Sequence, residues 1–322
     1  MDIRAYLTAI RSAFGPGRRA IRPCRSICMV ALTLMTVRAN ADTLAYALAL
    51  NPQTGTQQSG VLNLATGIFS SAVATSPIIQ YLAPGPNGSY LTMSFDGNLK
   101  SINPLTGATT VIGPTGFGDC SSPASPCGSN SQLSFGSAGG KLYGTDFANN
   151  LYAIDPVTGK ATLIGATGVP GVPFVPASSN PDGTFNFYDE NLFGADGHLF
   201  LNFDAGIFDP ATSVNTTVIA AILYELDPNT GQATKVGPTA FGLLTVSNLY
   251  GTIYGFNEVT NQLVILDVTN GATSIVGDLD SSIGLISGAA PVGIAPIPEP
   301  ASIALVLTGV TGLLVRRRHK IV

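Results

Sequence analysis

The chain has 322 residues, of which 11 % are charged, and it contains no tryptophan. Residues 42–297 hold 17 acidic residues, four lysines and no arginine, which gives this part a formal net charge of −13. A surface of this charge repels phosphate backbones and excludes nucleic-acid binding. It also disfavours direct electrostatic binding of acidic polysaccharides, unless divalent cations bridge the two.

Residues 1–41 are predicted to be a secretory signal peptide. Six arginines in the first 25 residues precede the apolar stretch Ile27–Val37. Ala39 and Ala41 then offer small side chains at the spacing that signal peptidase requires, which places the new N-terminus at Asp42. We therefore expect residues 42–296 to be exported.

Residues 42–296 repeat one phrase, in which two alternating apolar and polar segments flank a tight turn that contains glycine. The copies are Leu151–Gly165, Leu223–Gly237, Leu99–Gly113, Leu263–Gly277 and, more weakly, Val61–Val73. Alternation around a turn of this kind predicts a β-hairpin. In such a turn, Asp155, Asp227 and Asn103 are expected to brace the backbone two residues further on, which is a structural and not a catalytic role.

Further strands are predicted before these hairpins. The nearer ones are Lys141–Asp146, Tyr90–Phe95, Thr252–Asn257 and Leu199–Asp204. Still earlier come the apolar stretches Pro77–Ala83, Gln132–Ser137 and Leu243–Ser247. Units of about four strands, with turn glycines 40 to 72 residues apart, predict an all-β fold of the β-propeller type instead of a β-sandwich.

The two ends of the repeat region are expected to complete one blade together. Thr43–Leu48 has the pattern of a second strand, and Ile283–Gly288 that of a lone first strand. We interpret Val169–Gly183 and Gly206–Ala220 as loops, which gives about five blades; a degenerate sixth blade in this interval is the alternative. The pattern resembles that of bacterial propellers of the NHL and quinoprotein-like kinds, and this resemblance implies a fold, not a function.

Cysteine usage fits an oxidising compartment. Cys24 and Cys28 leave with the signal peptide, so Cys120 and Cys127 are the two cysteines of the exported part. We expect them to form a disulfide that closes a short loop rich in serine and proline.

The exported part offers little for catalysis. It has one histidine, His198, which follows Asp196-Gly197 and is expected at a turn, and it has no Gly-x-Ser-x-Gly motif. No catalytic residue and no cofactor is therefore predicted. Calcium is the one metal considered, because acidic residues are expected in loops at Asp278–Asp280, Asp189–Glu190 and Asp182. The architecture also resembles that of propeller lactonases, so the alternative is an extracellular hydrolase or lactonase with a metal in the central channel.

Residues 297–322 have three parts: the motif Pro298-Glu299-Pro300, an uncharged segment Ala301–Val315, and a basic stop. The basic residues are Arg316, Arg317, Arg318 and Lys320. As a helix, the uncharged segment would be roughly 22 Å long against a bilayer core of about 30 Å, which makes it a short transmembrane helix. The basic residues would lie on the cytoplasmic side.

This tail resembles the PEP-CTERM sorting signal. The resemblance implies processing near the Pro-Glu-Pro motif by an exosortase, a membrane protease of Gram-negative bacteria that make exopolysaccharide. We expect an intermediate anchored in the inner membrane, followed by delivery to the cell surface or the extracellular medium, with the tail either clipped or retained. The expected function is that of a non-catalytic binding or structural propeller that partners polysaccharide or surface proteins in a biofilm.

Overall fold

The computed structural model describes residues 44–292, apart from 52–53, 76–78, 86–88, 119–131, 170–183, 210–213 and 281–283. These residues all belong to the unit that begins at Leu44. No helix among them is long and apolar enough to cross a membrane. Several predicted features lie outside the described residues: the signal peptide with Ala39, Ala41 and Asp42, the Cys120–Cys127 disulfide, and the whole tail from residue 297.

The described residues form twenty strands in five antiparallel sheets, and each sheet is one blade with its strands in the following order from the inside outward. Blade 1 contains β20 (Leu285–Pro291), β1 (Leu44–Asn51), β2 (Thr56–Asn63) and β3 (Phe69–Thr75). Blade 2 contains β4 (Gln80–Pro84), β5 (Tyr90–Met93), β6 (Asn98–Ile102) and β7 (Thr109–Pro114). Blade 3 contains β8 (Gln132–Ala138), β9 (Lys141–Asp146), β10 (Asn150–Ile154) and β11 (Ala161–Ala166). Blade 4 contains β12 (Phe185–Ala195), β13 (His198–Asp209), β14 (Val214–Leu226) and β15 (Ala233–Pro238), and blade 5 contains β16 (Leu243–Leu249), β17 (Thr252–Asn257), β18 (Gln262–Leu266) and β19 (Thr273–Asp278).

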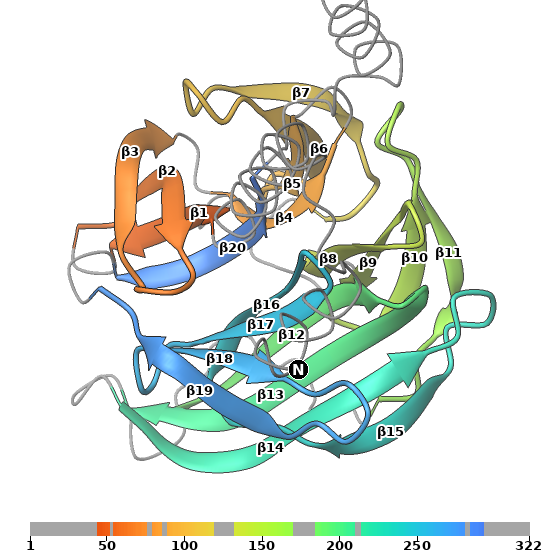
Figure 1. Ribbon diagram of the computed structural model, residues 1–322. Helices are drawn as coiled ribbons and strands as arrows, with labels where there is room; N and C mark the ends of the chain where they lie inside the picture. Colours follow the sequence, from red (N-terminus) through yellow and green to blue (C-terminus); the bar gives the residue numbers. More distant parts are fainter. Residues whose placement is uncertain are drawn as a thin grey trace, which may run out of the picture. The chain divides into compact units, whose positions relative to one another are not determined.

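The sheets stand around a common centre as a five-bladed β-propeller (Figure 1). The inner strands β4, β8, β12, β16 and β20 contact one another in a closed ring, which we call the hub. Blade 1 is completed by both ends of the described chain, because β20 pairs with β1. The predictions of five blades and of this closure are confirmed.

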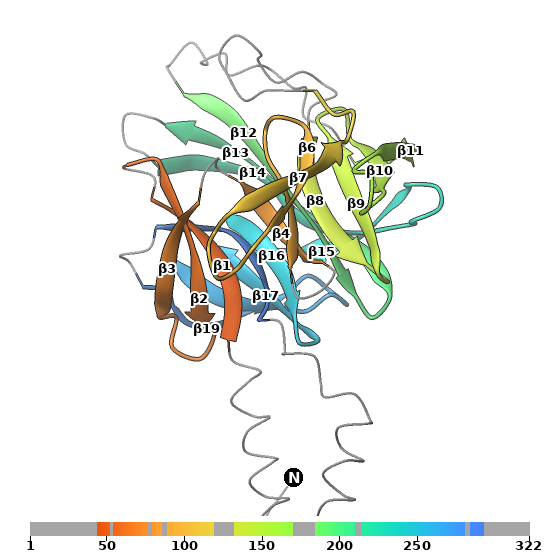
Figure 2. The ribbon, with the colours of Figure 1, turned by 90° about the horizontal axis from the view of Figure 1, so that it is seen from above.

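Blade 4 fills the interval in which a sixth blade was the alternative. The prediction of a loop at Gly206–Ala220 is wrong, because β13 continues to Asp209 and β14 begins at Val214. β-branched residues dominate the start of β14, and they favour paired strands. With 11, 12 and 13 residues, β12, β13 and β14 reach past the other blades on one side of the ring (Figure 2).

The turns of the repeat have the predicted chemistry. The Oδ1 atoms of Asp155 and Asp227 each accept a hydrogen bond of 2.8 Å from the backbone two residues on, and that of Asn103 accepts one of 2.9 Å. The turn glycines Gly67, Gly107, Gly159, Gly231 and Gly271 all have a positive φ. Residues with a Cβ atom adopt this left-handed conformation only at an energetic cost, which explains why each turn has a glycine at this position.

In three repeats the glycine that ends the repeat has a second role, because the turn of the next blade packs directly on it. A Cβ atom added to one of these glycines would overlap a backbone carbonyl of that turn; the pairs are Gly113 with Thr158, Gly165 with Thr230, and Gly237 with Asn270. The repeated phrase therefore encodes contacts between blades as well as hairpins.

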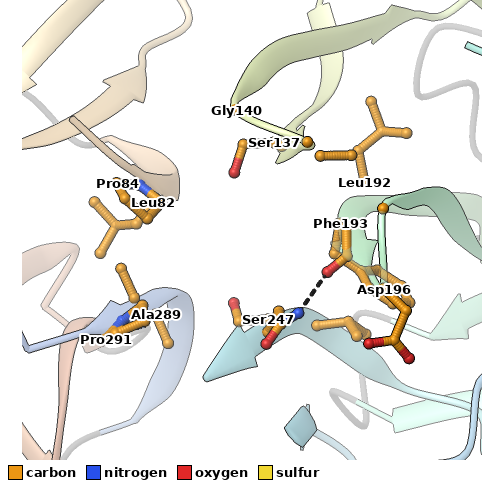
Figure 3. A pocket seen from close by; sticks show the side chains of 18 residues that line it. Leu82, Pro84, Ser137, Gly140, Leu192, Phe193, Asp196, Ser247, Ala289 and Pro291 are labelled. Carbon is orange, nitrogen blue, oxygen red and sulfur yellow. Dashed lines mark hydrogen bonds between the residues drawn. The ribbon is translucent and has the colours of Figure 1, made fainter. Parts of the chain in front are cut away.

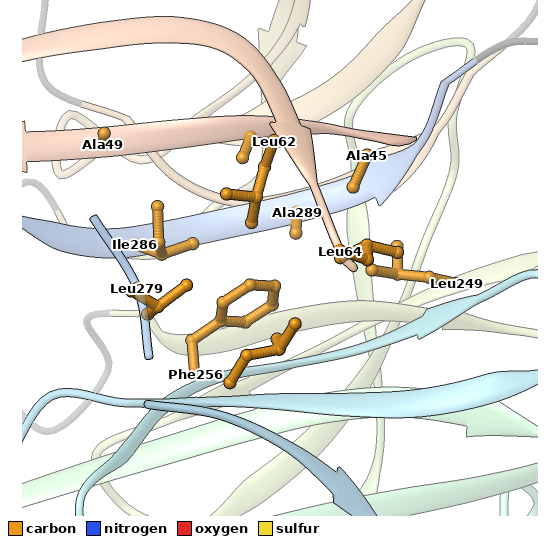
Figure 4. Packing of buried hydrophobic residues seen from close by; sticks show 11 residues of the cluster. Ala45, Ala49, Leu62, Leu64, Leu249, Phe256, Leu279, Ile286 and Ala289 are labelled. Atoms are coloured by element: carbon orange, nitrogen blue, oxygen red, sulfur yellow. The ribbon is translucent and has the colours of Figure 1, made fainter. Parts of the chain in front are cut away.

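Hydrophobic cores fill the spaces between neighbouring blades. Between blades 1 and 5, Leu62 and Ile286 pack with Leu249 and Phe256 (Figure 4). Burial of each such large side chain contributes about 1.5–3 kcal/mol. The ring is thus held together by apolar contacts that involve residues far apart in the sequence.

Candidate functional site

A cavity of about 250 Å³ opens at the centre of the ring, and we call it the channel mouth (Figure 3). The last residues of every inner strand line it, namely Leu82 and Pro84 of β4, Gly136–Ala138 of β8, Leu192–Gly194 of β12, Val246–Asn248 of β16 and Ala289–Pro291 of β20. The inner strands approach closely here because small residues stand at the contacts. A Cβ atom at Gly136 would overlap the carbonyl of Leu192.

The channel mouth is polar but nearly uncharged. Its described lining offers backbone groups of glycines, the hydroxyls of Ser137 and Ser247, and one carboxylate, that of Asp196. The Nδ2 atom of Asn248 donates a hydrogen bond of 2.8 Å to the carbonyl oxygen of Gly194. These groups form no arrangement of nucleophile and base, but they can make hydrogen bonds to a neutral ligand.

A second polar feature lies on β12 and β13, further along the strands from the channel mouth. Asp189 pairs with Asp204, and Asn191 pairs with Asn202, in the antiparallel register of these strands. Residues directly opposite each other, and residues two apart in one strand, project from the same face of a sheet. These four side chains therefore share one face, and we call them the acid–amide cluster.

The acid–amide cluster faces the start of blade 5. The Oδ2 atom of Asp204 accepts hydrogen bonds from the backbone N–H groups of Gly242 (3.1 Å) and Leu243 (3.0 Å). The Nδ2 atom of Asn191 donates to the carbonyl of Leu243 (2.9 Å) and to the Oδ2 atom of Asp189 (3.1 Å). The cluster is thus held against a neighbouring blade by backbone contacts.

Several atoms of the cluster are buried without a hydrogen-bond partner among the described residues. Asn191, Asn202 and Asp204 are at most 1 % exposed. The atoms without a partner are Oδ1 of Asn191, Oδ1 and Nδ2 of Asn202, and Oδ1 of Asp204. Each such atom costs about 1–3 kcal/mol if nothing satisfies it.

The carboxyl groups of the cluster are hard to ionise in this structure. Burial raises the pKa of Asp204 to about 7, although the N–H groups of Leu243 and Gly242 act against the shift. Burial raises the pKa of Asp189 well above its usual range, and the carboxylates of Glu258 and Asp204 raise it further. Within the described residues the ion pairs are Lys100–Asp96 and His198–Glu225, so neither brings a cation to the cluster.

Glu190 lies on the opposite face of β12, toward blade 3. Its Oε2 atom accepts a hydrogen bond of 2.6 Å from the hydroxyl of Thr145, while its buried Oε1 has no partner among the described residues. Burial raises the pKa of Glu190 to about 7, and the carboxylate of Asp146 raises it further.

The pKa of Tyr81 on β4 is raised well above its usual value, mainly by burial and then by the charges of Asp189 and Glu190.

The structure changes the position expected for several candidate residues. Asp189–Glu190 were expected in a loop, and this is wrong, since they lie inside β12. The prediction of a turn position for His198 is also wrong: it is the first residue of β13, directly after the turn Asp196–Gly197, and its Nδ1 lies 2.6 Å from Oε1 of Glu225.

The remaining calcium candidates lie apart from the cluster. Asp278 ends β19, where its Oδ1 accepts a hydrogen bond of 3.3 Å from Gln262, and Asp280 follows it. Asp182 is outside the described residues. The sequence reasoning missed Asn191, Asn202 and Asp204. Their signal was the spacing Asp-x-Asn on one strand and Asn-x-Asp on the next.

No family model and no curated protein matches the chain. Among solved structures, the chain is similar to one from a nidogen/laminin complex, with 12 % identity, 76 % of this chain and 96 % of that chain covered, and a TM-score of 0.39. It is similar to a structural genomics protein of unknown function from Bacteroides thetaiotaomicron (14 % identity, 77 % and 62 % covered, TM-score 0.42). A third is the PQQ-bound aldose sugar dehydrogenase from Streptomyces coelicolor (12 % identity, 68 % and 87 % covered, TM-score 0.37). These likenesses are remote, so the fold assignment follows from the five sheets themselves.

Proposed function

We propose that the chain is a non-catalytic binding protein of the cell surface or extracellular matrix, exported and sorted by an exosortase-type system. Its ligand is an uncharged carbohydrate, such as a neutral exopolysaccharide of a biofilm, bound at the channel mouth. The observation that carries this proposal is the lining of the mouth, to which all five blades contribute residues and blades 3, 4 and 5 contribute the polar side chains Ser137, Asp196, Ser247 and Asn248.

The chemistry of the channel mouth matches neutral sugars better than charged ligands. Sugar hydroxyls both donate and accept hydrogen bonds, and the hydroxyls of Ser137 and Ser247 offer complementary partners. Asp196 disfavours acidic sugars by repulsion. The volume of about 250 Å³ is below the roughly 300–1,000 Å³ of pockets for larger ligands, so the mouth suits about one sugar residue of a chain.

Binding is tested with the purified full chain and a panel of neutral and acidic oligosaccharides, by calorimetry. Ser137→Leu fills the channel mouth, and Ser101→Leu on β6 is the matched control outside it. We expect neutral oligosaccharides to bind to wild type and to the control, but not to Ser137→Leu. If both variants bind neutral oligosaccharides equally well, the channel mouth is not the binding site.

The sorting claim is tested by cell fractionation of two variants. Deletion of residues 297–322 should release the exported chain from the membrane. Replacement of Pro298, Glu299 and Pro300 by alanine leaves the apolar segment and basic stop intact, so this variant should stay in the inner membrane. If both variants fractionate like wild type, exosortase sorting is wrong. Mass spectrometry of the mature C-terminus then separates a clipped tail from one that retains Arg316.

The alternative function, an extracellular hydrolase or lactonase, is tested by measuring substrate turnover. The cluster of carboxyl and amide groups near the hub is the feature that a hydrolase or lactonase would use. Turnover of lactone or ester substrates by the purified full chain, abolished by Asp204→Asn, would overturn the non-catalytic part of the proposal.

A further inference from the structure

We propose that Asp189, Asn191, Asn202 and Asp204 bind one divalent cation, calcium by preference, between blade 4 and blade 5. This site is separate from the channel mouth and does not depend on the carbohydrate proposal. It would use Oδ1 of Asn191, Asn202 and Asp204, which are buried and without a hydrogen-bond partner among the described residues, together with the half-buried carboxylate of Asp189.

Hydrogen bonds at neighbouring atoms fix the orientation of the free oxygens of Asn191 and Asp204. Both hydrogen bonds of Asn191 use Nδ2, which fixes its amide and leaves Oδ1 free. Two backbone N–H groups hold Oδ2 of Asp204, which leaves Oδ1 free in the same way. Each side chain is therefore positioned by one polar atom and presents the other. Metal ligands are commonly oriented by such outer hydrogen bonds.

Strand pairing brings the residues that carry these free atoms close together. Directly opposite residues have Cβ atoms about 4.5–5.5 Å apart, and the two pairs Asp189–Asp204 and Asn191–Asn202 are successive same-face positions. Asn202 is fully buried beside Asp204, whose pKa burial raises and the Asn202 amide lowers, and neither of its amide atoms has a well-formed hydrogen bond among the described residues. A bound ion would require its Oδ1 to face the cluster. Of the seven buried side-chain atoms without a partner among the described residues, four belong to this cluster.

The ligand atoms and the charge of the acid–amide cluster favour calcium. Among the described residues, no three His, Cys, Asp or Glu side chains converge on a point, so a site here needs its amide oxygens. Carboxylate and amide oxygens with added water are the ligands of calcium, which accepts six to eight oxygens. Zinc prefers histidine and cysteine, which the cluster lacks. One divalent ion would balance the charges of Asp189 and Asp204, which have no cationic partner among the described residues and lie near the carboxylate of Glu258.

Calcium bound here would tie β12 and β13 to the blade 5 backbone through Asp204 and Leu243. A ligand that binds only the folded state raises its stability. At saturating calcium we expect the Tm of a chain this size to rise by at least about 5 °C.

The test starts from the purified full chain, freed of metal with EDTA and then titrated with CaCl₂ or MgCl₂ by calorimetry, with Tm measured in parallel. We expect one calcium per chain, and weaker binding of magnesium. Asp204→Asn keeps the acceptor for Gly242 and Leu243 but removes the charge, and it should weaken calcium binding at least about tenfold. Asp196→Asn removes an equal charge at the channel mouth and should bind like wild type.

A second variant keeps the proposal testable if Asp204→Asn does not fold. Asn202→Leu removes two buried atoms without partners, so it should be at least as stable as wild type in EDTA and yet lose the rise in Tm with calcium. The proposal is overturned if folded wild type binds no divalent ion at 10 mM, in which case buried water or protons satisfy the cluster. It is also overturned if Asp204→Asn and Asp196→Asn weaken binding equally.

Discussion

The buried carboxyl group of Glu190 predicts that Glu190→Gln stabilises the protein much more at pH 8 than at pH 5. Burial raises the pKa of this group from 4.5 to about 7. Since the pKa in the folded state is above that in the unfolded state, folding favours the protonated form. This contribution is complete below about pH 4.5 and is lost as the pH rises through about 7.

The size of the effect follows from the shift. A pKa change of about 2.5 units corresponds to about 3 kcal/mol between the two ends of the titration. Glutamine has the same shape as protonated Glu190, and Thr145 can still donate to its carbonyl oxygen. The amide nitrogen takes the place of Oε1, which already lacks a partner, so this cost is similar in both proteins.

Urea unfolding followed by circular dichroism at pH 5, 6.5 and 8, in EDTA, measures the difference. We expect the variant to be more stable than wild type by less than about 1 kcal/mol at pH 5 and by up to about 3 kcal/mol at pH 8. Glu225→Gln is the control, because Glu225 is an exposed carboxylate paired with His198. A variant that is less stable than wild type at pH 8 would refute the argument from burial.

Two further predictions concern the repeat. Gly237→Ala places a Cβ atom on the carbonyl of Asn270 and should lower the free energy of unfolding in urea by about 1–3 kcal/mol. Gly277 occupies the same position of the next blade and has nothing within 4 Å, so Gly277→Ala should change this free energy by less than about 0.5 kcal/mol. Equal effects would contradict the packing role of Gly237. Asp227→Ala removes the hydrogen bond to the Asn229 N–H and should lower the Tm. Asp227→Asn keeps an acceptor for this N–H and should have a Tm close to that of wild type. If the two variants have the same Tm, the Asp227 side chain does not stabilise the turn.

The fold was predictable because the repeat is local. Each hairpin carries its own alternation, turn and glycine, so a single copy identifies its strands without knowledge of the rest. The same reasoning failed where blade 4 departs from the phrase. Polar residues dominate the middle of Phe185–Ala195, and we identified no strand there, although this segment is the inner strand β12.

The acid–amide cluster could not be predicted from the sequence because it depends on register. Asp189 and Asp204 are 15 residues apart, and only their pairing across β12 and β13 places them on one face. The backbone of Gly242 and Leu243, which fixes Asp204, comes from another blade. A one-residue slip between the strands would send the side chains of one strand to the opposite face.

Blade 4 differs from blades 2 and 5 in the polar side chains that it buries near the hub. In blade 2 the hydroxyl of Thr92 donates to the carbonyls of Gln80 and Tyr81, both at 2.9 Å. In blade 5 the hydroxyl of Thr245 donates to the carbonyl of Ile286 at 2.9 Å. Threonine therefore satisfies buried positions on an inner strand (Thr245 of β16) and beside one (Thr92 of β5) with a hydrogen bond to a backbone carbonyl.

Blade 4 instead carries carboxyl and amide groups at such positions and leaves several of their atoms without a partner. Groups that break a local rule without structural gain are expected at functional sites. If the cluster were only structural, Asn202→Leu would be neutral or stabilising under every condition. If the cluster binds calcium, wild type should become more stable than Asn202→Leu once calcium is present. A reversal in the order of the two stabilities as the calcium concentration rises would therefore distinguish a calcium site from a purely structural cluster.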